Sequence, residues 1–149
     1  MYIIIFYFYE ITLYEIKMTT KKPVKINIRG IKVIVNDDFY RYKMEEVQLI
    51  SQKQKTVFEN INNICKDLGR DVTHLLKYLK NYFGIAIEYK NDTALTTKNL
   101  VKDDVQNAIY KYIDEFVLCR KCFNPETILT DKKKKTIMTC NACSFTGEI

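Results

Sequence analysis

The central part of the chain contains three segments in which apolar and polar residues alternate with the period of an α-helix. The first segment follows Asn60, a residue type that often caps helices, and ends at Gly69, which suits the left-handed position after a helix. The second segment runs from Asp71 to Gly84 in the same way, and the third covers residues 105–116. Two short helices with a tight connection resemble a helix-turn-helix unit, although many small α/β domains contain such a pair.

Alternation with a period of two predicts strands before and after the first two helices. Residues 25–36 and 55–59 read as extended segments, and residues 85–97 read as a β-hairpin that turns at Asn91 and Asp92. We therefore expect an α+β fold, with a small α/β domain that contains the helix pair and this hairpin.

Four cysteines close to the end of the chain form two C-x-x-C pairs. They are Cys119, Cys122, Cys140 and Cys143. Each pair lets two thiolates from one tight turn reach the same metal ion, and the residues between the pairs suffice for a β-hairpin that brings them together. Four thiolates close a tetrahedral site, so we expect one structural Zn²⁺ in a zinc ribbon. The alternatives are two disulfides, four unrelated thiols, or iron held by the same thiolates.

These patterns divide the chain into three parts. We expect an N-terminal extension over residues 1–44, a central α/β domain over residues 45–116, and the zinc ribbon over residues 117–149. The ribbon is too short to fold by burial of apolar side chains alone, so metal binding is expected to supply folding free energy on the order of 10 kcal/mol.

The first 16 residues are strongly apolar, but they do not fit a membrane or export signal. They lack the basic start and the small-residue cleavage site of a signal peptide, and Glu10 and Glu15 interrupt a stretch already too short to span a bilayer. Two interpretations remain: a helix that docks on a partner protein, or a spurious extension over residues 1–17 with translation starting at Met18. We expect no contact with a membrane.

The formal net charge is +6, and lysine supplies most of the positive charge. Such a charge suits a partner that carries phosphates, but it is common in soluble proteins generally. Lys, Asn, Ile and Tyr are all abundant and have A/T-rich codons, so codon usage is an alternative explanation for part of the lysine excess. At the expected tip of the ribbon hairpin lie Lys132, Lys133, Lys134 and Lys135. They are candidates for RNA phosphate contacts, or for a solvated turn whose charge prevents edge pairing.

The remaining residues with reactive side chains do not form a pattern typical of an enzyme. Cys65 lies in an apolar helical pattern, which indicates a thiol in the core. It also makes the number of cysteines odd, and this favours a reducing, cytoplasmic compartment over a secreted disulfide framework. His74, the only histidine, has no ligand cluster around it in the sequence. We find no Ser-His-Asp arrangement, phosphate-cradling glycine loop or convincing carboxylate pair, so the chain is not expected to be a GTPase.

Residues 116–129 (FVLCRKCFNPETIL), followed by the second C-x-x-C pair, resemble the zinc-ribbon region of two translation initiation proteins. These are the beta subunit of initiation factor 2 and the N-terminal domain of initiation factor 5. The resemblance covers roughly residues 25–149, and metal binding alone would not require the NPET phrase at residues 124–127. It implies an initiation module whose partners are the gamma subunit of factor 2, initiator tRNA and the small ribosomal subunit. A zinc-ribbon nucleic-acid binder outside translation is the remote alternative.

The chain resembles the two relatives in different places. Residues 39–44 (FYRYKM) look like the start of factor 5, in which the arginine corresponding to Arg41 promotes GTP hydrolysis on the gamma subunit. Lys55 lies in a further segment similar to factor 5 and is expected to assist, whereas residues 70–84 are similar to the beta subunit. The alternative for Arg41 is a packing role over neighbouring aromatic residues such as Tyr42. Because the lysine blocks of the beta subunit and the C-terminal helical domain of factor 5 are missing, we expect a reduced homologue.

Overall fold

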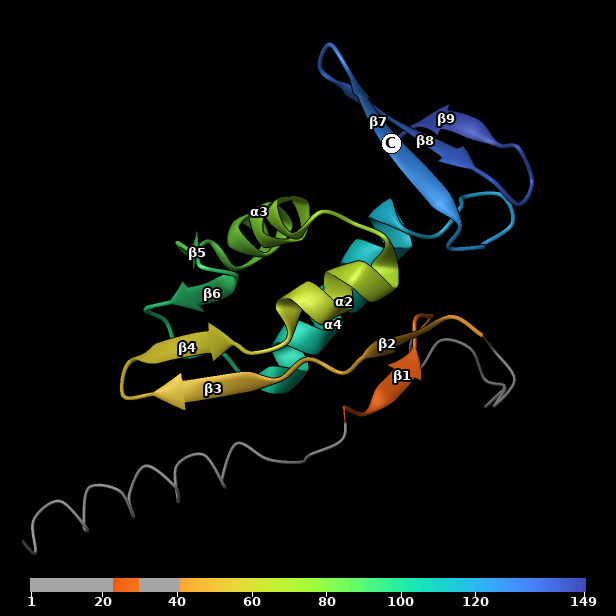
Figure 1. Ribbon diagram of the computed structural model, residues 1–149. Coiled ribbons are helices and arrows are strands. Elements are labelled where there is room, and N and C mark those ends of the chain that lie inside the picture. Colours follow the sequence, from red (N-terminus) through yellow and green to blue (C-terminus); the bar gives the residue numbers. More distant parts are fainter. Residues whose placement is uncertain (1–22, 30–40) are drawn as a thin grey trace, which may run out of the picture.

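The computed structural model describes residues 23–29 and 41–149 of the chain (Figure 1). In chain order its elements are β1 (Lys25–Asn27), β2 (Lys43–Glu45), β3 (Leu49–Gln52), β4 (Lys55–Phe58), α2 (Ile61–Leu68), α3 (Val72–Phe83), β5 (Glu88–Lys90), β6 (Thr93–Thr96), α4 (Lys102–Phe116), β7 (Thr127–Lys132), β8 (Lys135–Cys140) and β9 (Thr146–Glu148). The predicted α+β class is confirmed. Within the described ranges, no helix is both long and apolar enough to cross a membrane.

The described strands form three antiparallel sheets. The central sheet has the order β3-β4-β6-β5, while β1 pairs with β2 and the ribbon has the order β7-β8-β9. The predicted hairpin is confirmed, and Asn91 and Asp92 form its turn with φ angles of 50° and 58°, as a two-residue primed turn requires. The strand predicted over residues 25–36 begins as β1 and ends at Asn27, and residues 30–36 of that prediction lie outside the described part.

The helix boundaries follow the capping residues that the sequence indicated. Asp71 caps α3 by accepting a hydrogen bond from the backbone N–H of Thr73 at 2.7 Å, and Gly69 and Gly84 end α2 and α3 at φ 61°. Asn60 precedes α2, but its side chain does not cap that helix. It accepts from the backbone N–H of Gln48 at 2.8 Å instead, which ties the start of α2 to the connection between β2 and β3.

One apolar core lies between the three helices and the central sheet. Helix α3 packs against both α2 and α4, and among the described residues Tyr112 of α4 is the largest fully buried side chain. The other large members of the core are Phe58, Ile61, Ile64, Leu75, Leu79, Ile109 and Ile113. Cys65 is 1% exposed within this core, which confirms that it is a core thiol.

Strands β1 and β2 add to the same core from the N-terminal side. Ile28 and Met44 are buried in it, and β2 packs against α2. The described residues of the predicted N-terminal extension are therefore packed onto the central α/β domain, and the boundary at residue 44 stays a prediction. Helix α4 runs through the molecule and ends beside the ribbon, so the core and the ribbon are joined through its C-terminal end (Figure 1).

Candidate metal centre

Two short turns of the same shape present the four cysteines. The backbone N–H of Cys119 donates to the carbonyl of Asn124 at 3.0 Å, and the backbone N–H of Cys140 donates to the carbonyl of Phe145 at 2.8 Å. In each turn the residue after the second cysteine has a left-handed backbone, with φ 57° at both Phe123 and Ser144. Each turn thus directs two sulfur atoms to one side, and the hairpin of β7 and β8 brings the two turns together.

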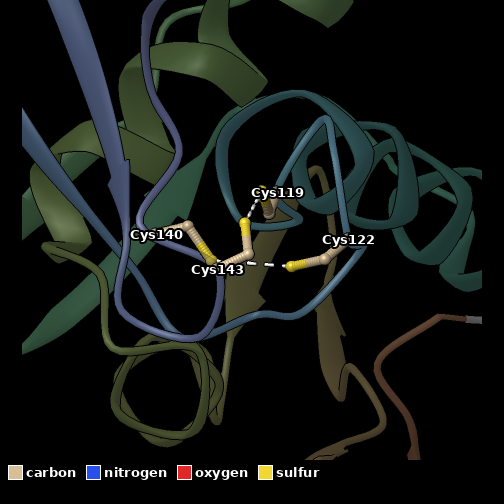
Figure 2. Close-up of side chains that lie close together, drawn as sticks. All are labelled: Cys119, Cys122, Cys140 and Cys143. Atoms are coloured by element: carbon tan, nitrogen blue, oxygen red, sulfur yellow. Dashed lines mark hydrogen bonds between the residues drawn. The ribbon is translucent and has the colours of Figure 1, made fainter.

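The four sulfur atoms point toward one another (Figure 2) and lie within 4.8 Å of each other. The Sγ atoms of Cys119 and Cys143 are 3.7 Å apart, and those of Cys122 and Cys140 are 3.6 Å apart. Sulfur atoms arranged tetrahedrally around a metal at about 2.3 Å would be separated by about 3.8 Å, whereas a disulfide bond is about 2.05 Å long. The cysteines carry no disulfide, and their spacing fits a single four-coordinate ion.

The donor groups also have the chemistry of a metal site. Burial disfavours ionisation of Cys119, but hydrogen bonds from the backbone N–H groups of Cys122 and Lys121 and from the thiols of Cys143 and Cys122 outweigh it and lower the pKa of this thiol to about 7. At Cys122 a hydrogen bond from the backbone N–H of Asn124 favours ionisation, but burial and the neighbouring thiols outweigh it and raise the pKa to about 12, so the first proton of the cluster is lost at Cys119. In the core, burial raises the pKa of Cys65 to about 12, together with the nearby charge of Asp71. The thiol in the core is therefore inert, while the cluster contains a thiol that ionises readily. With all four positions filled by sulfur, such a site has no position for a substrate.

The NPET phrase connects the metal turns with the rest of the protein. The side chain of Asn124 accepts a hydrogen bond from the backbone N–H of Glu126 at 2.8 Å, and the carbonyl of Glu126 accepts from Asn141 in the second turn at 2.9 Å. The carboxylate of Glu126 in turn accepts a hydrogen bond from the hydroxyl of Tyr42, next to β2. These contacts give the phrase a structural role that metal coordination does not explain.

Arg70 joins the ribbon to the central domain. Its guanidinium donates to the carbonyl of Phe116 at the end of α4, from Nε at 3.1 Å and from Nη2 at 2.9 Å. The same group donates to the carbonyl of Thr127 at 2.8 Å and to its hydroxyl at 2.5 Å. The Thr127 hydroxyl donates to the carbonyl of Val117 at 2.6 Å. Sequence reasoning missed this contact, because its only signal is an arginine placed between a helix-ending glycine and a capping aspartate.

The other predicted site residues lie apart from the cysteines. The side chain of Arg41 is 79% exposed; its Nη2 is 4.0 Å from Oε1 of Glu126, and its guanidinium is 5.3 Å from the centre of the Tyr42 ring. Phe39 and Tyr40 lie outside the described residues. Lys55 is exposed at the start of β4, in the central sheet. The roles predicted for Arg41 and Lys55 stay predictions.

The four lysines lie at the tip of the β7–β8 hairpin, as the spacing predicted. Lys133 and Lys134 form the turn with positive φ angles, and both side chains are exposed. Lys135 forms an exposed ion pair with Glu148 at 2.8 Å. The RNA contact predicted for Lys132 to Lys135 stays a prediction.

Comparison with known proteins finds relatives of two kinds. A sequence model of the family described as the domain found in initiation factors 2B and 5 matches residues 32–146. Translation initiation factor 2 subunit beta of Methanosarcina mazei is 31% identical over 103 residues, which cover 69% of this chain and 51% of that protein. The protein of the same name from Haloarcula marismortui is 30% identical over 105 residues, 69% of this chain and 78% of that protein.

Eukaryotic translation initiation factor 5 of Dictyostelium discoideum is 34% identical over 129 residues, which cover 84% of this chain. The match covers 32% of that protein, so the chain corresponds to about half of the M. mazei relative and about a third of the D. discoideum relative.

Arg70→Ala is expected to lower the free energy of unfolding by about 2–4 kcal/mol, because two partly buried carbonyl groups lose a charged donor. Arg70→Lys should recover only part of this, since one ammonium group cannot reproduce the planar set of donors. Urea denaturation measures the change. The matched control is Arg120→Ala, which removes an exposed arginine with one hydrogen bond to the carbonyl of Glu148 and should cost no more than about 0.5 kcal/mol. Equal midpoints for the Arg70→Ala and Arg120→Ala variants would contradict the joining role.

Proposed function

Because the chain belongs to the family of the domain found in initiation factors 2B and 5, which includes translation initiation factor 2 subunit beta and eukaryotic translation initiation factor 5, we propose that it is a module of translation initiation. In this proposal it binds the gamma subunit of initiation factor 2, as a beta subunit does, and acts in the cytoplasm near initiator tRNA and the small ribosomal subunit. The observation that carries the proposal is that the matched range covers the central domain and the ribbon up to residue 146, which Arg70 joins.

We propose that the four cysteines hold one Zn²⁺ ion. The support is the tetrahedral spacing of the sulfur atoms and the absence of disulfides among them. The ion would supply folding free energy to a ribbon that has little apolar core of its own, and it would take no part in any reaction.

A role like that of factor 5 is the second candidate, and the exposure of Arg41 favours it. An exposed ion pair at 4.0 Å contributes little free energy, so the arginine can leave Glu126 at small cost and reach a nucleotide site on a partner. A guanidinium placed there neutralises charge that develops during phosphoryl transfer, which typically accelerates hydrolysis by roughly 10³ to 10⁵. The chain would then regulate a GTPase without being one.

Freshly purified protein is expected to contain one zinc per chain by elemental analysis. Chelation should unfold the ribbon while the central domain keeps its helical circular dichroism, because the helices pack around a separate apolar core. Cys122→Ser should abolish zinc binding, whereas Cys65→Ala should keep the full zinc content, because its thiol lies in the core. Iron in place of zinc, or disulfides among the four cysteines, would refute this assignment.

Affinity purification of the tagged chain is expected to recover the gamma subunit of initiation factor 2. An excess of authentic beta subunit should displace the chain if the two occupy the same surface. A tagged basic protein of similar size and charge serves as the control for nonspecific capture of ribosomes. Recovery of neither the gamma subunit nor small ribosomal subunits would end the proposal of an initiation module.

Single-turnover phosphate release from a GTP-loaded ternary complex on small ribosomal subunits tests Arg41. Arg41→Ala should lose the stimulation completely and Arg41→Lys should lose most of it, because lysine lacks the planar two-pronged donor. Lys55→Ala should cost less. Zinc content and thermal unfolding should not change in any of the three variants, since both side chains are exposed. If Arg41→Ala stimulates hydrolysis as well as the unaltered chain does, the motif serves packing against Tyr42 and Glu126.

A further inference from the structure

A cleft of about 380 Å³ lies between α3 and the tip of the β7–β8 hairpin. It is separate from the metal cluster, and neither the metal site nor the Arg41 hypothesis uses it. One wall comes from α3 through His74, Lys77, Tyr78 and Asn81. The opposite wall comes from the lysine-rich hairpin tip, so the cleft unites two segments that are about fifty residues apart in the chain.

Helix spacing explains the first wall. Residues three and four positions apart lie on one face of a helix, so Lys77, Tyr78, Asn81 and Tyr82 form a continuous surface. The rings of Tyr78 and Tyr82 stack with their centres 6.0 Å apart and an angle of 23° between their planes. Tyr82 is 42% exposed, and Nζ of Lys111 lies 4.9 Å from the centre of its ring. This face of α3 is therefore aromatic and basic together.

The second wall adds positive charge. Among the described residues, three lysines, Lys77, Lys134 and Lys135, line the cleft together with one carboxylate, that of Asp131, which accepts a hydrogen bond from the hydroxyl of Thr136 at 2.7 Å. Lys135 is paired with Glu148 at 2.8 Å, so Lys77 and Lys134 supply the positive charge that exceeds that of Asp131. Burial lowers the pKa of His74, so its ring is neutral at pH 7 and adds no charge. The cleft consequently has an excess of positive charge and favours an anion.

We propose that this cleft, together with the Tyr78–Tyr82 surface beside it, is a binding site for single-stranded RNA. Lys77 and Lys134 bind backbone phosphates, and an unstacked base lies on the exposed ring of Tyr82. Lysines beside stacked aromatic rings are typical of surfaces that bind single strands. Protein-binding surfaces, in contrast, are depleted in lysine. Stacking on tyrosine requires a free base face, which excludes a regular duplex. The inference rests on the proposed function, because an initiation module works against tRNA and ribosomal RNA.

Fluorescence anisotropy of the zinc-loaded full chain with a labelled oligouridine of about 12 nucleotides tests this site. The double variant Lys77→Gln, Lys134→Gln should weaken binding about tenfold at low salt. It should also reduce the slope of log K against log salt concentration by about 0.7 for each phosphate that the protein no longer neutralises. Lys66→Gln is the matched control, because it removes an exposed lysine on α2 and should leave both quantities unchanged.

Tyrosine variants test stacking separately from charge. Tyr82→Ala should weaken binding about tenfold without changing the salt slope, because the stacking ring is lost. Tyr82→Phe keeps the ring and removes only the hydroxyl that accepts a hydrogen bond from Lys111, so this variant should bind like the unaltered chain. A duplex RNA of the same length should bind more weakly than the single strand. Equal binding of duplex and single strand, or variants that all bind like the unaltered chain, would overturn the site. Binding of a polyglutamate peptide but not of RNA would overturn it in favour of an acidic protein partner.

The two proposals fail separately. Loss of RNA binding with intact recovery of the gamma subunit overturns only the cleft. Intact RNA binding, with neither the gamma subunit nor small ribosomal subunits recovered, overturns only the proposed function.

Discussion

The guanidinium of Arg70 holds the C-terminal end of α4 against the first strand of the ribbon. Carbonyl groups at a helix end lack partners within the helix, and the carbonyl of Thr127 at the start of β7 lies close to them. The planar guanidinium of Arg70 donates hydrogen bonds to the carbonyl of Phe116 at the helix end and to the carbonyl of Thr127. This contact acts together with the hydrogen bond from Nη2 of Arg29 to the carbonyl of Phe123 at 2.9 Å to orient the ribbon and to set the distance between its hairpin tip and α3. Both the cleft beside Lys77 and the contact between Glu126 and Tyr42 depend on that orientation.

The cluster of four cysteines is the second constraint, and it acts within the ribbon. Cys119 and Cys140 are buried while Cys122 and Cys143 are half-buried, so the ion would lie at the edge of the module with sulfur on all sides. A three-stranded sheet of this size buries little apolar surface apart from Met138. Four thiolates without a metal would repel one another as they ionise. With the proposed ion bound, metal binding and folding of the ribbon would be one event, and the surface that the ribbon presents would exist only when the site is filled.

The sequence alone was sufficient for the elements that depend on local interactions. The caps at Asp71, Gly69 and Gly84 lie where the residue types indicated, because a side-chain oxygen or a left-handed backbone acts within one turn of a helix. The turn at Asn91 and the two C-x-x-C turns are local in the same sense. Since the spacing between the cysteine pairs has few geometric solutions, the grouping of the four sulfur atoms was predictable as well.

Only the tertiary structure decided the contacts between segments that are distant in sequence. Strand β2 is too short for a periodic pattern, and burial of Met44 against α2 assigns it to the core. Arg70 and Thr127 are in contact because α4 ends beside β7, and the type of neither residue predicts that contact. The same holds for Lys77 and Lys134. The physical reason is that a long-range contact depends on how whole elements pack, whereas a cap, a turn or a metal knuckle depends on a few consecutive residues.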